Sequence, residues 1–429
     1  MYNSLSISDS FPAYTKYDPE VPVWCITPDL QGSIHRFFDT TPVSPSGRYV
    51  ALTRFLFENR LPELKDTAKI VLIDLESGTG KEIAETSGWD TQTGAQVQWG
   101  RTDQELFYND MDCRTWEPFG IRIDPETGEK NRLDGTVYMI SPDGKSALSP
   151  CLKRLWITQR GYGVIAPKDH IPKNQGAPAD DGIYITDLDS GKQRLLISIE
   201  KIVQQAGLKA RMPLEKGGYY IFHVKWSPDG NRIFAVIRYK VEKNFFTLMK
   251  MGRWTRSIRP QLITMNADGS DVRVAVDENT WVKGGGNHPN WCSDNESISL
   301  NLRFSEGRSS SREPHRFVTA KADGSGITTY SEKITGSGHP VMYPGNRFIL
   351  TDAYPGEPVS FGDKTVPIRW IDLENETETN LIRIRSKPAY EGTQHQRGSS
   401  LAWDKSISYI VQAVRTDIVM SLSHTCGRC

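Results

Sequence analysis

The chain of 429 residues is long enough for a large hydrophobic core, in one big domain or in two to three ordinary ones. Its 52 basic residues balance its 52 acidic residues, and no basic stripe stands out, so nucleic acid and anionic membranes are not expected partners. No apolar run approaches the roughly 20 residues of a membrane-spanning helix. Because the polar N-terminal segment 1–20 has no signal-peptide pattern, we expect a cytoplasmic protein.

A repeat runs through the sequence, in which an apolar strand, a Ser-Pro-Asp-Gly-like turn and a second apolar strand follow one another. Gly, Asp and Asn fill the turns because tight hairpin connections need positive φ angles. The turns of this kind are at 44–47, 100–103, 141–144, 227–230, 292–295, 343–346 and 403–406. They predict seven copies of one structural unit.

A second turn signal alternates with the first, as at Asp74 to Gly78, where a strand ends in Asp-x-x-x-Gly. Each repeat unit is therefore predicted to form four antiparallel strands joined by hairpins. Seven four-stranded units of about 40 to 65 residues predict an all-β fold, a seven-bladed β-propeller with its blades packed radially around a channel. We expect residues 1–429 to form this single domain, with a strand at about 21–27 closing the ring.

Insertions interrupt the repeats at about 161–181, 198–218 and 240–260. The first is rich in Pro and Gly, and the second begins with a stretch typical of a short amphipathic helix. The third carries Trp254 among other aromatic residues, together with four basic residues in its second half. A loop of this composition over one face of a propeller suits an anionic or sugar ligand, and the alternative is a packed hairpin extension.

Polar residues, mostly histidines, recur near one position of the repeat, three residues before the inner-strand aromatic residue, as in His288 and Trp291. Inner strands of a propeller start near one mouth of the channel, so side chains at this position are expected to converge on the axis. The residues at or near it are His35, Gln96, His223, His288, His339 and His395. Such residues either form a site or hydrogen-bond between blades, as they do in non-catalytic propellers.

Neutral imidazole is the commonest ligand for borderline divalent metals, and three His with an amide make a plausible open metal site. The preferred set is His288, His339 and His395, with Gln394 or His223 close by. The sequence contains no Gly-x-Ser-x-Gly elbow and has no room for a hydrolase domain, which argues against a prolyl-oligopeptidase-type enzyme.

The pattern resembles the polysaccharide lyases of the oligogalacturonate lyase type, which are β-propellers, and the related ulvan lyases. The resemblance runs across most of the chain and is carried by the segments SIHRFFD, GAQVQWG, RGYG and NHPNW, at 33–39, 94–100, 160–163 and 287–291. It implies β-elimination on a uronate. A base removes the proton α to the carboxylate, a cation stabilises the charge that develops, and an acid assists departure of the 4-oxygen.

By this resemblance, His and Gln residues of late blades hold a manganese ion, and His288, His339, Gln394 and His395 match that role best. The family's last-blade His-Pro-His-Pro is not present, because this chain has Gln-His-Gln-Arg at 394–397. Ulvan lyases use a His pair, a Tyr and an Arg. Tyr162 matches the Tyr, whereas no His lies between His35 and His170.

Two hypotheses follow from the sequence. The first is a metal-dependent lyase that acts on short anionic uronate oligosaccharides. Its candidate catalytic residues are Tyr162, His223, Arg238 and Arg259, and its candidate substrate-binding residues are His35, Gln96, Trp254 and Arg397. The second is a non-catalytic propeller of the TolB or WD40 kind that binds a protein or a sugar at the channel mouth.

Overall fold

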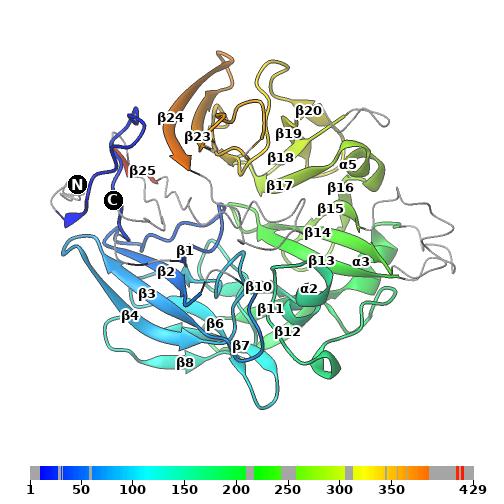
Figure 1. Cartoon of the computed structure of the whole chain (residues 1–429). Helices are drawn as coiled ribbons and strands as arrows, with labels where there is room; N and C mark the ends of the chain where they lie inside the picture. Colours follow the sequence, from blue (N-terminus) through cyan, green and yellow to red (C-terminus); the bar gives the residue numbers. More distant parts are fainter. Residues whose placement is uncertain are drawn as a thin grey trace.

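The computed structural model describes residues 10–27, 30, 32–57, 60–208, 217–242, 258–304, 313–343, 345–354, 356–363, 365–385, 412–414 and 417–419. Within these ranges, six four-stranded antiparallel sheets succeed one another along the chain and surround a common centre as the blades of a propeller (Figure 1). The prediction of an all-β propeller is thus confirmed. In every blade the strands lie side by side in the order of the sequence.

The blades are numbered in chain order. Blade one consists of β1 (Ser33–Ile34), β2 (Tyr49–Phe55), β3 (Ala68–Asp74) and β4 (Thr79–Thr86). Blade two consists of β5 (Gln98–Trp99), β6 (Leu106–Asp112), β7 (Glu117–Ile123) and β8 (Lys130–Arg132). Blade three consists of β9 (Met139–Ile140), β10 (Ser146–Pro150), β11 (Gly182–Asp187) and β12 (Gln193–Ser198).

The second half of the ring repeats this arrangement. Blade four consists of β13 (Gly217–Trp226), β14 (Arg232–Val241), β15 (Ile258–Asn266) and β16 (Arg273–Val276). Blade five consists of β17 (Gly286–Trp291), β18 (Ser297–Leu302), β19 (Arg316–Lys321) and β20 (Ile327–Thr329). Blade six consists of β21 (Val341–Met342), β22 (Phe348–Thr351), β23 (Thr365–Asp372) and β24 (Thr377–Arg385).

The prediction of seven four-stranded blades is wrong. After β24 the described residues form only β25 (Gln412–Val414) and β26 (Asp417–Val419), which pair as a two-stranded sheet. The last sequence repeat lacks the outer turn signal, and without that turn a repeat cannot form its outer hairpin. The turn motif at 403–406, which suggested a seventh blade, lies outside the described residues.

Short helices lie between strands, three of them at or near two of the predicted insertions, 161–181 and 198–218. Helix α2 (Leu152–Thr158) and the 3₁₀ turn η1 (Lys168–His170) separate β10 from β11, and α5 (Glu278–Gly284) follows β16. Helix α3 (Ile199–Gln205) is the predicted amphipathic helix, with Ile199 and Ile202 buried and with Ser198 accepting a hydrogen bond from the backbone of Lys201 as N-cap. None of the described helices is long and apolar enough to cross a membrane.

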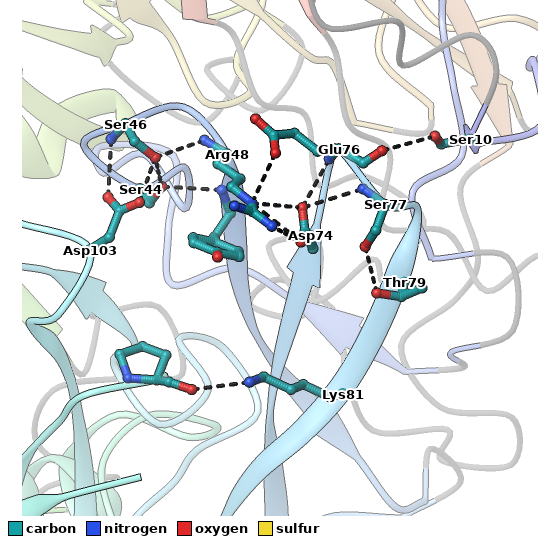
Figure 2. A network of polar contacts seen from close by, with 12 residues as sticks. Ser10, Ser44, Ser46, Arg48, Asp74, Glu76, Ser77, Thr79, Lys81 and Asp103 are labelled. Atoms are coloured by element: carbon teal, nitrogen blue, oxygen red, sulfur yellow. Dashed lines mark hydrogen bonds and ion pairs between the residues drawn. The ribbon is translucent and has the colours of Figure 1, made fainter. Parts of the chain in front are cut away.

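The predicted inner turns at 44–47, 100–103, 141–144, 227–230 and 292–295 lie on described residues and are confirmed, and some of them also join neighbouring blades. Ser46 of the first turn donates its backbone N–H to the carboxylate of Asp103 in the second, at 3.0 Å. Figure 2 shows this contact beside the ion pair of Arg48 with Asp74, which links β2 to β3. Asp229 in blade four bonds to Asn295 in blade five in the same manner, at 2.9 Å. The turn residues therefore shape the hairpins and also link blade one to blade two and blade four to blade five.

The N-terminal segment packs against blade six. Glu20 donates its backbone N–H to Leu381 on β24 at 2.9 Å, and Val23 is buried in a cluster with residues of β23 and β24. Between 21 and 27 the backbone makes one isolated bridge, from Trp24 to Ala13, rather than a regular strand. Closure of the ring by this segment stays a prediction.

Candidate functional site

Histidines of three blades meet around the segment that follows β1. The Phe37 ring lies 5.5 Å from the ring of His223 on β13 and 5.8 Å from that of His339, which precedes β21. The Phe38 ring lies 5.7 Å from that of His288 on β17. The expected convergence of these side chains from distant parts of the sequence is therefore observed.

The backbone at the repeated position is unusual. Gln96 and His288, which stand three residues before Trp99 and Trp291, both have φ angles of 58°. Side chains other than glycine rarely adopt this left-handed conformation, and such strain gathers at functional sites. Strand β13 also shifts its register next to His223, and β17 does so around His288. Bulges of this kind re-aim a side chain.

Three of the four candidate catalytic residues lie together, and we call them the His223 group: Tyr162, His223 and Arg238. The Tyr162 ring packs 4.8 Å from Phe222 and 6.0 Å from His223, edge to face in both cases. The guanidinium carbon of Arg238 lies 3.9 Å from the centre of the Phe222 ring. The group thus combines a phenol, an imidazole and a permanent cation.

Two further residues orient this group. Arg238 donates from Nη1 to the side-chain oxygen of Gln159 at 2.7 Å, at the end of α2. The phenolic oxygen of Tyr138, just before β9, lies 2.5 Å from Nδ1 of His223. Blade three therefore supports the side chains that blade four presents.

His288 and His339 form an imidazole pair, with ring centres 4.1 Å apart. Asp352, just after β22, accepts the backbone N–H of His339 at 2.6 Å and lies 3.0 Å from its Nδ1. Nε2 of His288 lies 3.3 Å from the hydroxyl of Tyr354, whereas its buried Nδ1 has no hydrogen bond of normal geometry. Each ring is thus held from one nitrogen.

A buried charged trio lies beside both groups: Arg36, Asp39 and Lys225. Arg36 bonds to Asp39 at 2.7 Å and Lys225 to the same carboxylate at 2.5 Å, and the side chains of all three are at most 2% exposed. Arg36 also donates to the side-chain oxygen of Gln96 at 2.8 Å. The trio carries one more positive than negative charge.

Burial sets the protonation of the imidazoles. It lowers the pKa of His35 to about 4 and, reinforced by nearby cations, holds the pKa of His223 well below its usual value. Burial and the neighbouring His339 do the same to the pKa of His288. These three rings are therefore neutral at pH 7. Burial lowers the pKa of Lys225 to about 8, and it raises the pKa of Tyr162, which stays a phenol.

The remaining candidates do not join this centre on the contacts observed. Arg259 on β15 makes an ion pair with Glu278 of α5, at 3.8 Å. Trp254, Gln394, His395 and Arg397 lie outside the described residues. Within the described ranges, no three His, Cys, Asp or Glu side chains are arranged to hold a metal ion. Of the four residues expected to bind a metal, His288 and His339 lie among the described residues.

Sequence reasoning missed several residues of the centre. Lys225 follows His223 by two positions on one strand, so the alternation of side chains across a strand would have placed both on one face. Arg36 and Asp39 flank Phe37 and Phe38 in the segment 33–39, where the sequence pattern singled out only His35 as a candidate site residue. Tyr138, Asp352 and Tyr354 have no sequence signal, because only the packing of blades brings them to the histidines.

The fold thus defines an all-β propeller with a centre rich in His, Tyr and buried charge. No protein-family model matches the sequence, and no curated protein matches it. Solved structures, in contrast, match the fold of this chain. The oligogalacturonate lyase from Vibrio parahaemolyticus matches with a TM-score of 0.54 and 12% identity, over 94% of this chain and 87% of that chain. An oligogalacturonate lyase in complex with manganese matches with a TM-score of 0.55 and 14% identity, over 96% of both chains. Identities this low show a shared fold.

Proposed function

We propose that the protein is a carbon–oxygen lyase that cleaves uronate-containing oligosaccharides by β-elimination. The observation that carries the proposal is the His223 group, where a phenol, a neutral imidazole and a fixed guanidinium lie next to the imidazole pair. Elimination needs those elements, namely proton-transfer groups and a cation beside the uronate carboxylate. The shared fold with oligogalacturonate lyases over almost the whole chain supports it.

Each residue has a role that its surroundings suit. Arg238, which is partly exposed, binds the carboxylate of the uronate and stabilises the negative charge that develops there. Neutral imidazoles can accept a proton or donate a hydrogen bond. Tyr162 remains protonated because burial raises its pKa, so it serves as the acid for the departing oxygen.

A divalent metal, manganese by analogy, would be held by His288 and His339. Metal-bound histidines nearly always give their other ring nitrogen to a carboxylate or another polar group, and Asp352 and Tyr354 supply such partners here. Nδ1 of His288 makes no hydrogen bond of normal geometry to a described residue, which fits a ligand role as well. The metal would supply a Lewis acid beside the substrate carboxylate. Gln394 and His395 are the proposed remaining ligands.

The test is an ultraviolet assay with a panel of uronate oligomers, with and without manganese, because elimination creates a double bond conjugated to a carboxylate. Tyr162→Phe and Arg238→Met should each lower kcat/KM by about 10²- to 10³-fold. Arg259→Met is the matched control, since its ion pair with Glu278 lies outside the His223 group. Absence of new absorbance with every uronate and metal would reject the proposal.

The second candidate is a non-catalytic propeller that binds its ligand at this centre. The burial of the charged trio favours this second function, because the side chains of Arg36, Asp39 and Lys225 are buried as those of structural ion pairs are. The same panel separates the two functions. A scaffold would bind uronate oligomers in calorimetry and release them unchanged.

A further inference from the structure

The bond between Tyr138 and His223 determines which nitrogen of His223 carries its proton. Tyr138 is 1% exposed, and its hydroxyl lies 2.5 Å from Nδ1 of His223. Within the described part of the chain, this is the only hydrogen bond of that hydroxyl. A buried O–H must donate to some acceptor or lose the free energy of that bond. The phenol therefore donates to Nδ1.

A nitrogen that accepts a hydrogen bond cannot carry the proton of a neutral imidazole, so the proton of His223 lies on Nε2. Burial, helped by the nearby cations Lys225 and Arg238, favours this neutral ring. Burial also raises the pKa of Tyr138 well above its usual value, which keeps the phenol as the donor. The two groups thus support the same assignment.

Nε2 of His223 is open to a ligand. It makes no hydrogen bond to a described residue, and it is not among the buried polar atoms that lack a partner. The residue as a whole is 5% exposed. The Tyr162 hydroxyl meets the same two conditions. The N–H of His223 and the O–H of Tyr162 are thus two donors of one group that make no hydrogen bond to a described residue.

We propose that His223 acts as a neutral hydrogen-bond donor through Nε2, and that Tyr138 is the positioning residue that fixes this tautomer. The role in catalysis rests on the proposed function. In the elimination, a neutral imidazole other than that of His223 takes the proton α to the carboxylate, and the electron pair of the broken C–H bond forms the new double bond. The bond to the 4-oxygen breaks, and that oxygen leaves with the proton of Tyr162. His223 donates to the carboxylate oxygen on which negative charge develops.

The direct experiment is nitrogen NMR of the full chain with ¹⁵N-labelled histidine. The spectrum of His223→Gln assigns the signals of His223 among the eight histidines. We expect an unprotonated Nδ1 and a protonated Nε2 at neutral pH. A protonated Nδ1 in the wild type overturns the proposal, whether or not the protein is a lyase.

Variants test the positioning role. Tyr138→Phe should populate the second tautomer, with the proton on Nδ1, to a measurable extent. Tyr108→Phe is the matched control, because Tyr108 is equally buried and its hydroxyl has no hydrogen-bond partner. An unchanged tautomer ratio of His223 in folded Tyr138→Phe would show that Tyr138 does not fix the tautomer. If that variant does not fold, the wild-type spectrum still decides which tautomer is present.

Activity separates a donor from a base. The amide of Gln donates a hydrogen bond but cannot take the proton, so His223→Gln should keep at least ten times the kcat/KM of His223→Ala. Equal loss in both variants, in a protein that does cleave uronates, would show that His223 acts as the base. A wild type that cleaves no uronate rejects the proposed function while the tautomer assignment stands on its spectrum.

Discussion

The carboxylate of Asp39 and the ammonium of Lys225 meet 2.5 Å apart, which ties the segment after β1 to the inner strand of blade four. Lys225 also donates to the backbone oxygen of Pro289 in blade five, at 2.9 Å. A single buried cation thus connects three parts of the ring, next to the His223 group and the imidazole pair.

Removing one partner of this ion pair should destabilise the protein. Lys225→Met leaves the buried carboxylate with Arg36 alone and should lower the free energy of unfolding by about 3–5 kcal/mol in denaturant titrations. Lys192→Met is the control, because its ion pair with Asp134 has side chains 77% and 55% exposed and should change stability by less than about 1 kcal/mol. Similar losses in the two variants would contradict a stabilising role for the buried pair.

Replacement of Gly163 by alanine should lower the free energy of unfolding more than replacement of another glycine with a similar φ angle. Gly163 and Gly128 have φ angles of 80° and 78°, so Ala costs about 1–2 kcal/mol at either for conformation alone. A Cβ at Gly163 would lie 2.2 Å from the backbone oxygen of Leu152, whereas none lies within 4 Å at Gly128.

Gly163→Ala should therefore cost about 1–3 kcal/mol more than Gly128→Ala in thermal or denaturant unfolding. It should also shift the adjacent Tyr162 and lower activity on uronates. Equal destabilisation by the two substitutions would show that the loop before η1 can move to accommodate a Cβ at Gly163.

Asp90 should give the protein a pH dependence between about 4 and 6. Burial raises its pKa from 3.8 to about 6, although the backbone N–H groups of Thr93 and Gly163 donate to it. The folded protein then holds this proton more tightly than the unfolded chain. Its contribution to stability falls as pH rises through this window, by about 3 kcal/mol for roughly two pKa units.

Asp90→Asn cannot titrate, so its unfolding free energy relative to wild type should rise by about 2.5 kcal/mol from pH 4 to pH 7. Asp110→Asn controls for lost backbone hydrogen bonds, since Asp110 accepts them from Ser87 and Met111. A constant difference between Asp90→Asn and wild type across this range would mean that Asp90 titrates as it does in the unfolded chain.

The sequence predicted what local chemistry determines. The hairpin turns, such as that at Gly47, were found because positive φ restricts residue choice, and the repeat of these turns led to the propeller. The convergence of His223, His288 and His339 followed from their equal places in the repeats. The number of blades did not follow, because a turn motif marks one hairpin and the last copy has no outer turn.

Contacts between blades had no such signal. Asp352 is an ordinary residue after an apolar strand until the hairpin of blade six brings it to His339. Tyr138 lies in the third repeat, which has no residue among the polar residues predicted at the recurring position. The bulge at His223 changes the direction of side chains by one residue, and periodicity alone does not locate bulges.

Asp352 should control manganese binding if the imidazole pair holds the metal. His288→Ala and His339→Ala should lose the roughly one equivalent of divalent metal that we expect in the wild type. Asp352→Asn should keep both ligands but weaken manganese affinity about 10- to 100-fold in calorimetry, because the carboxylate no longer orients the His339 ring and raises its basicity. Asp372→Asn is the control, since Asp372 lies on the same blade but pairs with Arg347. Unchanged manganese affinity in Asp352→Asn would place the metal away from His339. A wild type that binds no manganese would leave elimination to the His223 group, with Arg238 as the cation.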